Sequence, residues 1–135
     1  MNSRLFPLAG TLLLALLLLG CTSTGQTSLQ AQEKTNVSVK VISADGSAIV
    51  DNAISIEKGK NALEAVKQTA DVKTKTYIGM GSLITAINGL QPDTEHYWAL
   101  YVDGKYADKS IDAYIIDKDT SIEIKLEKID FSKMG

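Results

Sequence analysis

The stretch YIGMGSLITAINGLQPDTEHYWALYVDGK, residues 77–105, decides how the rest of the chain is interpreted. It holds the only Trp and the only His of the 135-residue chain, and three of its five Tyr. Two runs rich in β-branched and aromatic residues flank a polar loop that contains Pro92, and this composition predicts two strands. Asp103 and Gly104 form a strong hairpin-turn signal after the second run. We expect this stretch to be β structure that presents a ligand.

The second run, beginning at His96, has two distinct faces if it is a strand. Alternation places on one face Trp98, Leu100 and Val102. The opposite face then holds Tyr97, Ala99 and Tyr101. Either face could pack on the core, and a Trp is more often a core residue than a ligand platform. Both interpretations of Trp98 stay open at this point.

Two glycines, Gly79 and Gly81, flank Met80 at the start of the stretch. One interpretation is a bend or bulge in a strand. The alternative is a close approach of a ligand to the backbone, which only glycine permits. No Lys-Ser or Lys-Thr pair follows, so the pattern is not a phosphate-binding P-loop.

Upstream of this stretch, the pattern predicts a hairpin followed by one helix. Val37, Val39 and Val41 alternate with polar residues, which is typical of a half-buried strand. A turn signal follows, and a second strand is expected over residues 48–57. The period then changes, and Asn61 is a plausible N-cap for an amphipathic helix over residues 62–70. Residues 71–76 are expected to be a charged connector.

The helix is too short to stand alone in water and must lie on the sheet. Downstream, Ile122, Ile124 and Leu126 alternate with charged residues and predict the last strand. Two strands, one helix and then more strands give an α+β fold of the ubiquitin-like β-grasp type, with a mixed sheet and one packed helix. The folded domain is expected to span residues 36–130.

The N-terminus is expected to be a targeting segment. Residues 8–19 are almost wholly Leu and Ala, too short to span about 30 Å of hydrocarbon comfortably, as in a signal peptide. The run ends in Leu18-Leu19-Gly20-Cys21, which resembles a bacterial lipobox. We predict a signal peptide over residues 1–20, acylation of Cys21 with chains such as palmitate, and a flexible tether over residues 21–35. The alternative is an uncleaved anchor helix with an incidental Cys.

Composition and motifs argue against several classes of function. The net charge of −2 and the pI near 5.3 give no basic patch for nucleic acid. The one Cys is assigned to lipidation and His96 has no evident partner, so we predict no enzyme and no catalytic cofactor. Asp112, Asp117 and Asp119 lack the twelve-residue calcium loop pattern and are expected to form turns, without a metal.

Three pieces of sequence, in order, carry a family resemblance. They are GSLITAINGL at residues 81–90, YWALYVDGK at residues 97–105, and then Tyr114 and Asp119 before the last strand. Together they resemble the transcobalamin-like C-terminal domain over residues 36–128. The resemblance implies the same β-grasp fold. In animal members this domain closes over cobalamin opposite a helical domain, and bacteria carry stand-alone versions.

The resemblance also implies ligand-binding residues. They are Ser82, Ile84, Ile87, Gly89, Leu90, Tyr97 and Trp98. Turn positions depart from the family pattern, with Asp103 in place of Asn, Lys118 in place of Gly and Ser110 where Gly is common. A cobalt-ligating His, where the family has one, comes from the helical domain, so His96 is expected to be a solvated loop residue.

Two functions follow from different classes of protein. The first is a lipid-anchored protein on the extracytoplasmic face of the cell membrane that binds cobalamin or a related corrinoid. It would work with a transporter or with a partner chain that supplies the helical half. The alternative is a β-grasp adhesion or scaffolding module that binds a protein or a glycan. The first predicts a shift in the corrin spectrum and quenching of Trp98 fluorescence when cobalamin is added. The second predicts a large exposed apolar patch and no concave pocket beside Trp98.

Overall fold

The computed structural model describes residues 30–133 of the chain. The predicted signal peptide, Cys21 and most of the predicted tether lie outside the described residues. No helix within residues 30–133 is long and apolar enough to cross a membrane.

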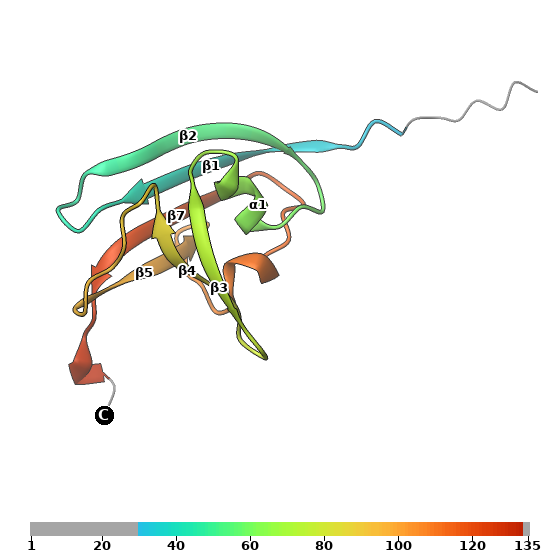
Figure 1. The fold of residues 1–135 in the computed structure, drawn as a ribbon. Helices are drawn as coiled ribbons and strands as arrows, with labels where there is room; N and C mark the ends of the chain where they lie inside the picture. The colour runs from blue at the N-terminus through green and yellow to red at the C-terminus, as the bar shows by residue number, and fades with distance from the viewer. Residues whose placement is uncertain (1–29, 134–135) are drawn as a thin grey trace, which may run out of the picture. The chain divides into compact units, whose positions relative to one another are not determined.

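The domain is built on a five-stranded mixed sheet with the strand order β2-β1-β7-β5-β6 (Figure 1). The strands are β1 (Lys34–Ile42), β2 (Ala48–Glu57), β5 (His96–Val102), β6 (Lys105–Tyr106) and β7 (Thr120–Lys128). The terminal strands β1 and β7 pair in parallel, and all other pairs are antiparallel. The expected hairpins are present, and the turn between β5 and β6 has Asp103 at a φ of +51° and Gly104 at +79°. This is the left-handed geometry that a two-residue hairpin requires.

The core lies on one face of this sheet. Val37, Val39 and Val41 of β1 are fully buried, as are Ile122 and Ile124 of β7. Helix α1 (Ala62–Lys67) covers that face with four buried residues of its own. The apolar residues that alternate with polar ones in the sequence are therefore the buried ones, and this pattern fixes the register of the two central strands.

Helix α1 begins with a capping box and is shorter than predicted. Asn61 Oδ1 accepts from the Glu64 N–H at 2.9 Å, and Glu64 Oε2 accepts from the Asn61 N–H at 3.0 Å. The helix ends at Lys67, three residues before the predicted end at Ala70. The Thr69 hydroxyl donates to the Val66 carbonyl at 2.9 Å, and this bond closes the chain into a turn.

A second, two-stranded sheet follows the helix and was not fully expected. It consists of β3 (Val72–Tyr77) and β4 (Gly81–Ile87). The prediction of a connector over residues 71–76 is wrong, because all of these residues except Asp71 belong to β3. Only Val72 of β3 is buried, so the strand lacks the apolar alternation that would reveal it. Gly79 lies in the tight turn between β3 and β4, and Gly81 is the first residue of β4, both at positive φ.

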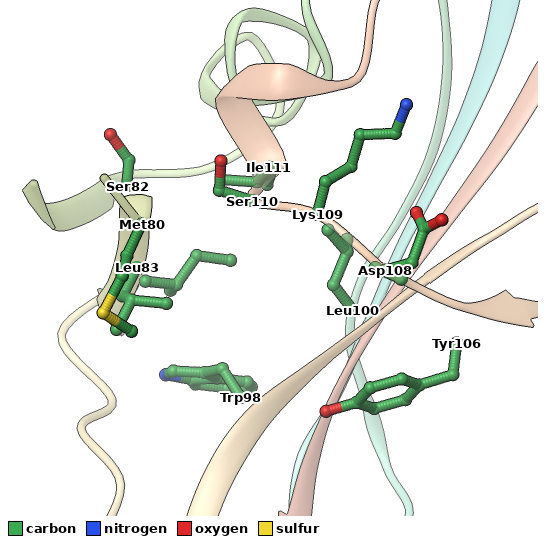
Figure 2. Close-up of a pocket in the computed structure, with 12 residues that line it drawn as sticks. Met80, Ser82, Leu83, Trp98, Leu100, Tyr106, Asp108, Lys109, Ser110 and Ile111 are labelled. Atoms are coloured by element: carbon green, nitrogen blue, oxygen red, sulfur yellow. The ribbon is translucent and has the colours of Figure 1, made fainter. Parts of the chain in front are cut away.

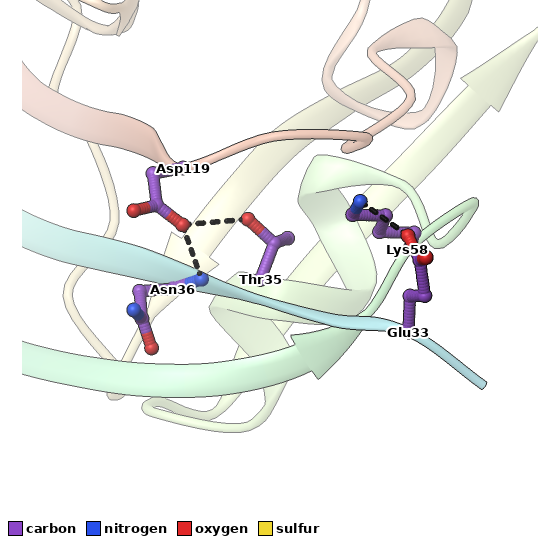
Figure 3. Close-up of polar contacts among 5 residues, drawn as sticks. All are labelled: Glu33, Thr35, Asn36, Lys58 and Asp119. Atoms are coloured by element: carbon purple, nitrogen blue, oxygen red, sulfur yellow. Dashed lines mark hydrogen bonds and ion pairs between the residues drawn. The ribbon is translucent and has the colours of Figure 1, made fainter. Parts of the chain in front are cut away.

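A set of polar contacts fixes the start of β1 (Figure 3). The Thr35 hydroxyl donates to Asp119 Oδ1 at 2.7 Å, and the Asn36 N–H donates to the same oxygen at 2.9 Å. Lys58 Nζ lies 2.5 Å from Glu33 Oε2. These bonds explain why β1 begins at Lys34, two residues before the expected start of the domain.

Candidate functional site

A pocket lies between β4, β5 and the segment that follows β6. Its volume is about 350 Å³. Figure 2 shows its walls, with Met80 and Leu83 on one side and Leu100 and Lys109 on the other. The lining residues are Met80, Ser82, Leu83, Ile84, Trp98, Leu100, Tyr106, Ala107, Asp108, Lys109, Ser110 and Ile111. The pocket thus combines an apolar floor with polar groups at its rim, which is typical of small-molecule sites.

Trp98 is both a core residue and part of the pocket. Its ring lines the pocket, and together with Leu100 it packs against the buried core cluster. The Trp98 Nε1–H is buried and has no hydrogen-bond partner. A buried donor without a partner is uncommon in folded proteins and costs about 1–3 kcal/mol. The core interpretation of Trp98 is therefore confirmed and the residue also lines the pocket, whereas its role as a ligand platform stays a prediction.

Ser82 and Asp112 join the two walls of the pocket. Asp112 belongs to the short 3-10 helix η1 (Ile111–Ala113). The Ser82 hydroxyl donates to Asp112 Oδ2 at 2.8 Å, and the Ser82 N–H donates to Oδ1 at 3.1 Å. Hydrogen bonds from Ser110 and Ser82 lower the pKa of Asp112 to about 2. The carboxylate is ionised at neutral pH and holds β4 against η1.

Gly81 allows this junction to form. A Cβ at Gly81 would lie 2.1 Å from Ser110 Oγ and 2.7 Å from Ser110 Cβ. Its φ is +81°, which L side chains rarely adopt. The close approach at this glycine is therefore made by the side chain of Ser110.

The loop at the far rim is held by Tyr114. The Tyr114 hydroxyl donates to Asp108 Oδ1 at 2.7 Å and accepts from the Asp108 N–H at 2.9 Å. Lys109 Nζ lies 4.9 Å from the centre of the Tyr114 ring. These contacts give Asp108 and Lys109 defined positions beside the pocket, where both line it.

Three of the seven predicted ligand-binding residues meet at this pocket, namely Ser82, Ile84 and Trp98. Ile87 is fully buried in the core, so its side chain is not at the pocket surface. Gly89 and Leu90 lie at the turn after β4 and do not line the pocket.

Tyr97 lies on the opposite face of the sheet from Trp98. There the Tyr101 hydroxyl donates to Glu127 Oε1 at 2.7 Å, and the Tyr97 hydroxyl lies 3.5 Å from Glu127 Oε2. The hydrogen bond to Glu127 raises the pKa of Tyr101 to about 12. The aromatic pair of the sequence is thus divided between two faces, as strand alternation requires.

Most residues that line the pocket are not among the predicted ligand-binding residues. Met80, Leu83, Leu100 and Tyr106 line the pocket, together with residues 107–111. Leu100 could have been found, because it shares the face of Trp98. The rim from residue 107 to 111 is irregular structure, and no periodicity in the sequence marks it.

The remaining candidates of the sequence lie away from the pocket. The expectation that His96 is a solvated loop residue is wrong, because it is the partly buried first residue of β5, and its Nδ1 lies 2.7 Å from Asp93 Oδ1 of the preceding loop. Asp112 and Asp119 hold β4 and β1 as described, and Asp117 is exposed. Within the part of the chain that the structure describes, no group of three or more His, Cys, Asp or Glu residues could hold a metal ion.

The comparison with protein families identifies the chain. Residues 59–128 match the model of the domain of unknown function DUF4430. The chain belongs to the DUF4430 family. No curated protein matches the sequence.

Solved structures share the fold of this DUF4430 domain. Haptocorrin in complex with Cbi superposes with a TM-score of 0.62 and 18% identity, over 73% of this chain and 26% of the haptocorrin chain. A protein of Ruminococcus gnavus ATCC 29149, described as a candidate metal binding protein, has a TM-score of 0.55 and 18% identity. That match covers 71% of this chain and 99% of the other. The β-grasp prediction is confirmed, and the chain spans about a quarter of the haptocorrin chain.

Proposed function

We propose that this DUF4430 domain binds a corrinoid in the pocket beside Trp98. The observation that carries the proposal is the pocket itself, because its apolar lining includes an aromatic ring and its rim holds Asp108, Lys109 and Ser110. A macrocycle with amide arms needs an apolar surface for its ring and a few polar anchors for its arms. The shared fold with haptocorrin, which was solved with Cbi, supports this ligand class.

The size of the pocket indicates how the ligand would bind. A volume of about 350 Å³ is at the lower end for small-molecule sites, so it would enclose only part of a corrinoid. The match covers 26% of haptocorrin, so most of that protein has no counterpart in this domain. We therefore propose weak binding by the domain alone and tighter binding when a partner chain, such as a transporter component, covers the exposed side of the ligand.

The polar rim sets the orientation of the ligand in this proposal. Lys109 is exposed at the rim and can donate to the carbonyl oxygen of an amide arm. Asp108 is already bonded to Tyr114, so it positions the loop more than it contacts the ligand. The Trp98 Nε1–H is buried, so in this proposal the indole contributes its apolar ring surface and not a hydrogen bond.

We propose binding without catalysis. The Ser82 hydroxyl contacts Asp112 and Thr76, and neither is a general base of the His type. The single His of the chain pairs with Asp93 away from the pocket. A nucleophile with a base in reach is therefore lacking among the residues that line the pocket.

We also propose that the domain is held on the extracytoplasmic face of the cell membrane by an acylated Cys21. The lipobox-like sequence before Cys21 supports this anchor, and the sequence after it suits a tether. Metabolic labelling with palmitate tests the anchor directly. Label is expected in the wild-type chain and should be lost from Cys21→Ser, and an unlabelled wild-type chain would rule out the anchor.

Titration with cyanocobalamin tests the ligand. Trp98 is the only Trp of the chain, so no other Trp contributes to the fluorescence that reports on the pocket. We expect saturable quenching together with a shift in the visible spectrum of the corrin. The absence of both at high micromolar ligand would contradict the proposal.

A second candidate function rests on the turn between β3 and β4. Ile78 at this turn is fully exposed, and Met80 is 65% exposed. Tyr77 and Leu83 are also exposed, so the turn presents an apolar surface that suits a protein partner. In that case Ile78→Ser would abolish partner binding, and cyanocobalamin would not quench Trp98.

A further inference from the structure

Strand β2 forms one edge of the five-stranded sheet. In the described part of the chain β2 pairs only with β1 (Figure 1). The strand is ten residues long, and its middle residues Asp51, Asn52 and Ala53 are exposed. It contains no Pro and no Lys, and its only register irregularity lies at its start, opposite Val41 and Ile42. Long edge strands usually carry such protective features, because they otherwise pair with other strands.

The pairing with β1 shows which backbone groups of β2 face outward. The Lys58 N–H donates to the Glu33 carbonyl at 2.8 Å, just beyond the end of the strand pair. Because bonded and non-bonded pairs alternate in antiparallel strands, the even-numbered residues of β2 bond to β1. The N–H and C=O groups of Asp51, Ala53 and Ser55 therefore point away from the sheet.

The acidic residues of β2 do not protect this edge. Asp51 stands opposite Lys40 of β1 in the register, and Glu57 stands opposite Lys34. Each carboxylate therefore has a Lys at the opposite position of the neighbouring strand, which offsets part of its charge for a second strand that approaches the edge.

We propose that a second copy of this chain pairs with β2 in antiparallel fashion about a two-fold axis at Ala53. This register joins the outward backbone groups of both copies. On the solvent face it places Ala53 opposite Ala53 and Asp51 opposite Ser55, whose hydroxyl can donate to the carboxylate. On the core face it places Val50 opposite Ile56 and Asn52 opposite Ile54. No like charges stand directly opposite each other, and the small side chains at the axis allow close approach.

The self-complementarity of β2 favours a second copy as the occupant over an unrelated extended peptide. Pairing through one strand buries less surface than a standard stable interface. The dimer is therefore weak and depends on concentration. It lies at the edge of the sheet formed by β2, whereas the Trp98 pocket is lined by β4, β5 and later residues, so the two proposals are independent.

Sedimentation velocity of the full chain, with a charge-swap pair at Ala53, tests this register. Ala53 is exposed and its N–H faces outward, so substitutions there leave the pairing with β1 in place. We expect the mass of the wild-type chain to rise with concentration. Ala53→Lys alone and Ala53→Glu alone should each weaken association about fivefold or more, because like charges then meet at the axis. An equimolar mixture of the two variants should restore it.

Ser38→Lys is the matched control. Ser38 is exposed on β1 and stands directly opposite Ala53, one strand in from the edge. The same added charge there should leave association within about twofold of the wild type. A wild-type chain that stays monomeric would overturn the proposal. Two other results would also overturn it: association that neither Ala53 variant weakens, and a mixture of the two variants that associates no better than each variant alone. Either result would place the contact between copies away from Ala53.

Discussion

The Ser82 hydroxyl donates a 2.8 Å hydrogen bond to Asp112 Oδ2, across thirty residues of sequence. This bond joins β4 to the 3-10 helix η1 and so connects two walls of the pocket beside Trp98. The Asp112 carboxylate also receives the Ser82 N–H at 3.1 Å. The shape of the pocket therefore depends on a carboxylate that must stay ionised.

Asp112 makes the stability of the domain sensitive to acid. Its pKa falls from 3.8 to about 2 because Ser110 and Ser82 donate hydrogen bonds to the charged form. Because the pKa of Asp112 is lower in the folded chain than in the unfolded chain, its ionised form stabilises the fold at any pH above the unfolded pKa. That contribution is lost as the pH falls from about 4 towards 2. Asp112→Asn should remove this part of the pH dependence. Urea unfolding at pH 7 and pH 3 measures it, with Asp117→Asn as the control at an exposed position.

If Asp112→Asn loses as much stability between pH 7 and pH 3 as the wild type and the control, the carboxylate is not held as described. At pH 7 alone, the variant should be less stable by about 1–3 kcal/mol, because charge-assisted hydrogen bonds are weakened.

Gly81 and Gly79 allow the close approach at Ser110 to be separated from backbone strain. Both glycines have positive φ, +81° and +82°. A Cβ at Gly81 would collide with Ser110, whereas a Cβ at Gly79 would meet nothing within 4 Å. Gly79→Ala should cost about 1–2 kcal/mol of unfolding free energy from its φ alone. Gly81→Ala should cost about 1–3 kcal/mol more, because Ser110 must move. Equal losses of unfolding free energy in the two variants, measured by chemical denaturation, would show that the contact with Ser110 adds nothing to the cost of Gly81→Ala.

Asp119 fixes the start of the first strand through Thr35 and Asn36. Its pKa is lowered because the Asn36 N–H and the Thr35 hydroxyl donate to it. Asp119→Ala should speed amide hydrogen exchange at the start of β1 and leave exchange in β5 near the wild-type rate. Asp117→Ala, two residues away and exposed, is the matched control. Unchanged exchange at the start of β1 in Asp119→Ala would contradict this role.

The strands of the main sheet were predictable because each central strand has one buried face. Val37, Val39 and Val41 are fully buried, and Ile122 and Ile124 match them on β7. The hairpin at Asp103 was predictable from its turn residues, which adopt the required positive φ. Strand β3 was not predictable in the same way, because only Val72 of its residues is buried and no apolar alternation remains.

The pocket was only partly predictable, since it is formed by residues that are distant in sequence. Trp98 and Ser82 were identified through the family resemblance. Ile87 and Tyr97 were identified in the same way, yet one lies in the core and the other on the opposite face of the sheet. The rim from Asp108 to Ile111 is held by the bond between Asp108 and Tyr114 and, through the adjacent Asp112, by Ser82, and no periodic pattern indicates these contacts.

The measurement that tests the central claim most directly is the dissociation constant of cyanocobalamin for three forms of the chain. They are the wild type, Leu83→Glu in the pocket wall, and Ile78→Glu at the neighbouring turn. Both substituted positions are exposed, so both variants should fold. We predict that Leu83→Glu weakens binding about tenfold or more, because it places a charge in the apolar pocket, and that Ile78→Glu leaves it within about twofold. Equal effects of the two variants, or no binding by the wild type, would contradict the assignment of this pocket as a corrinoid site.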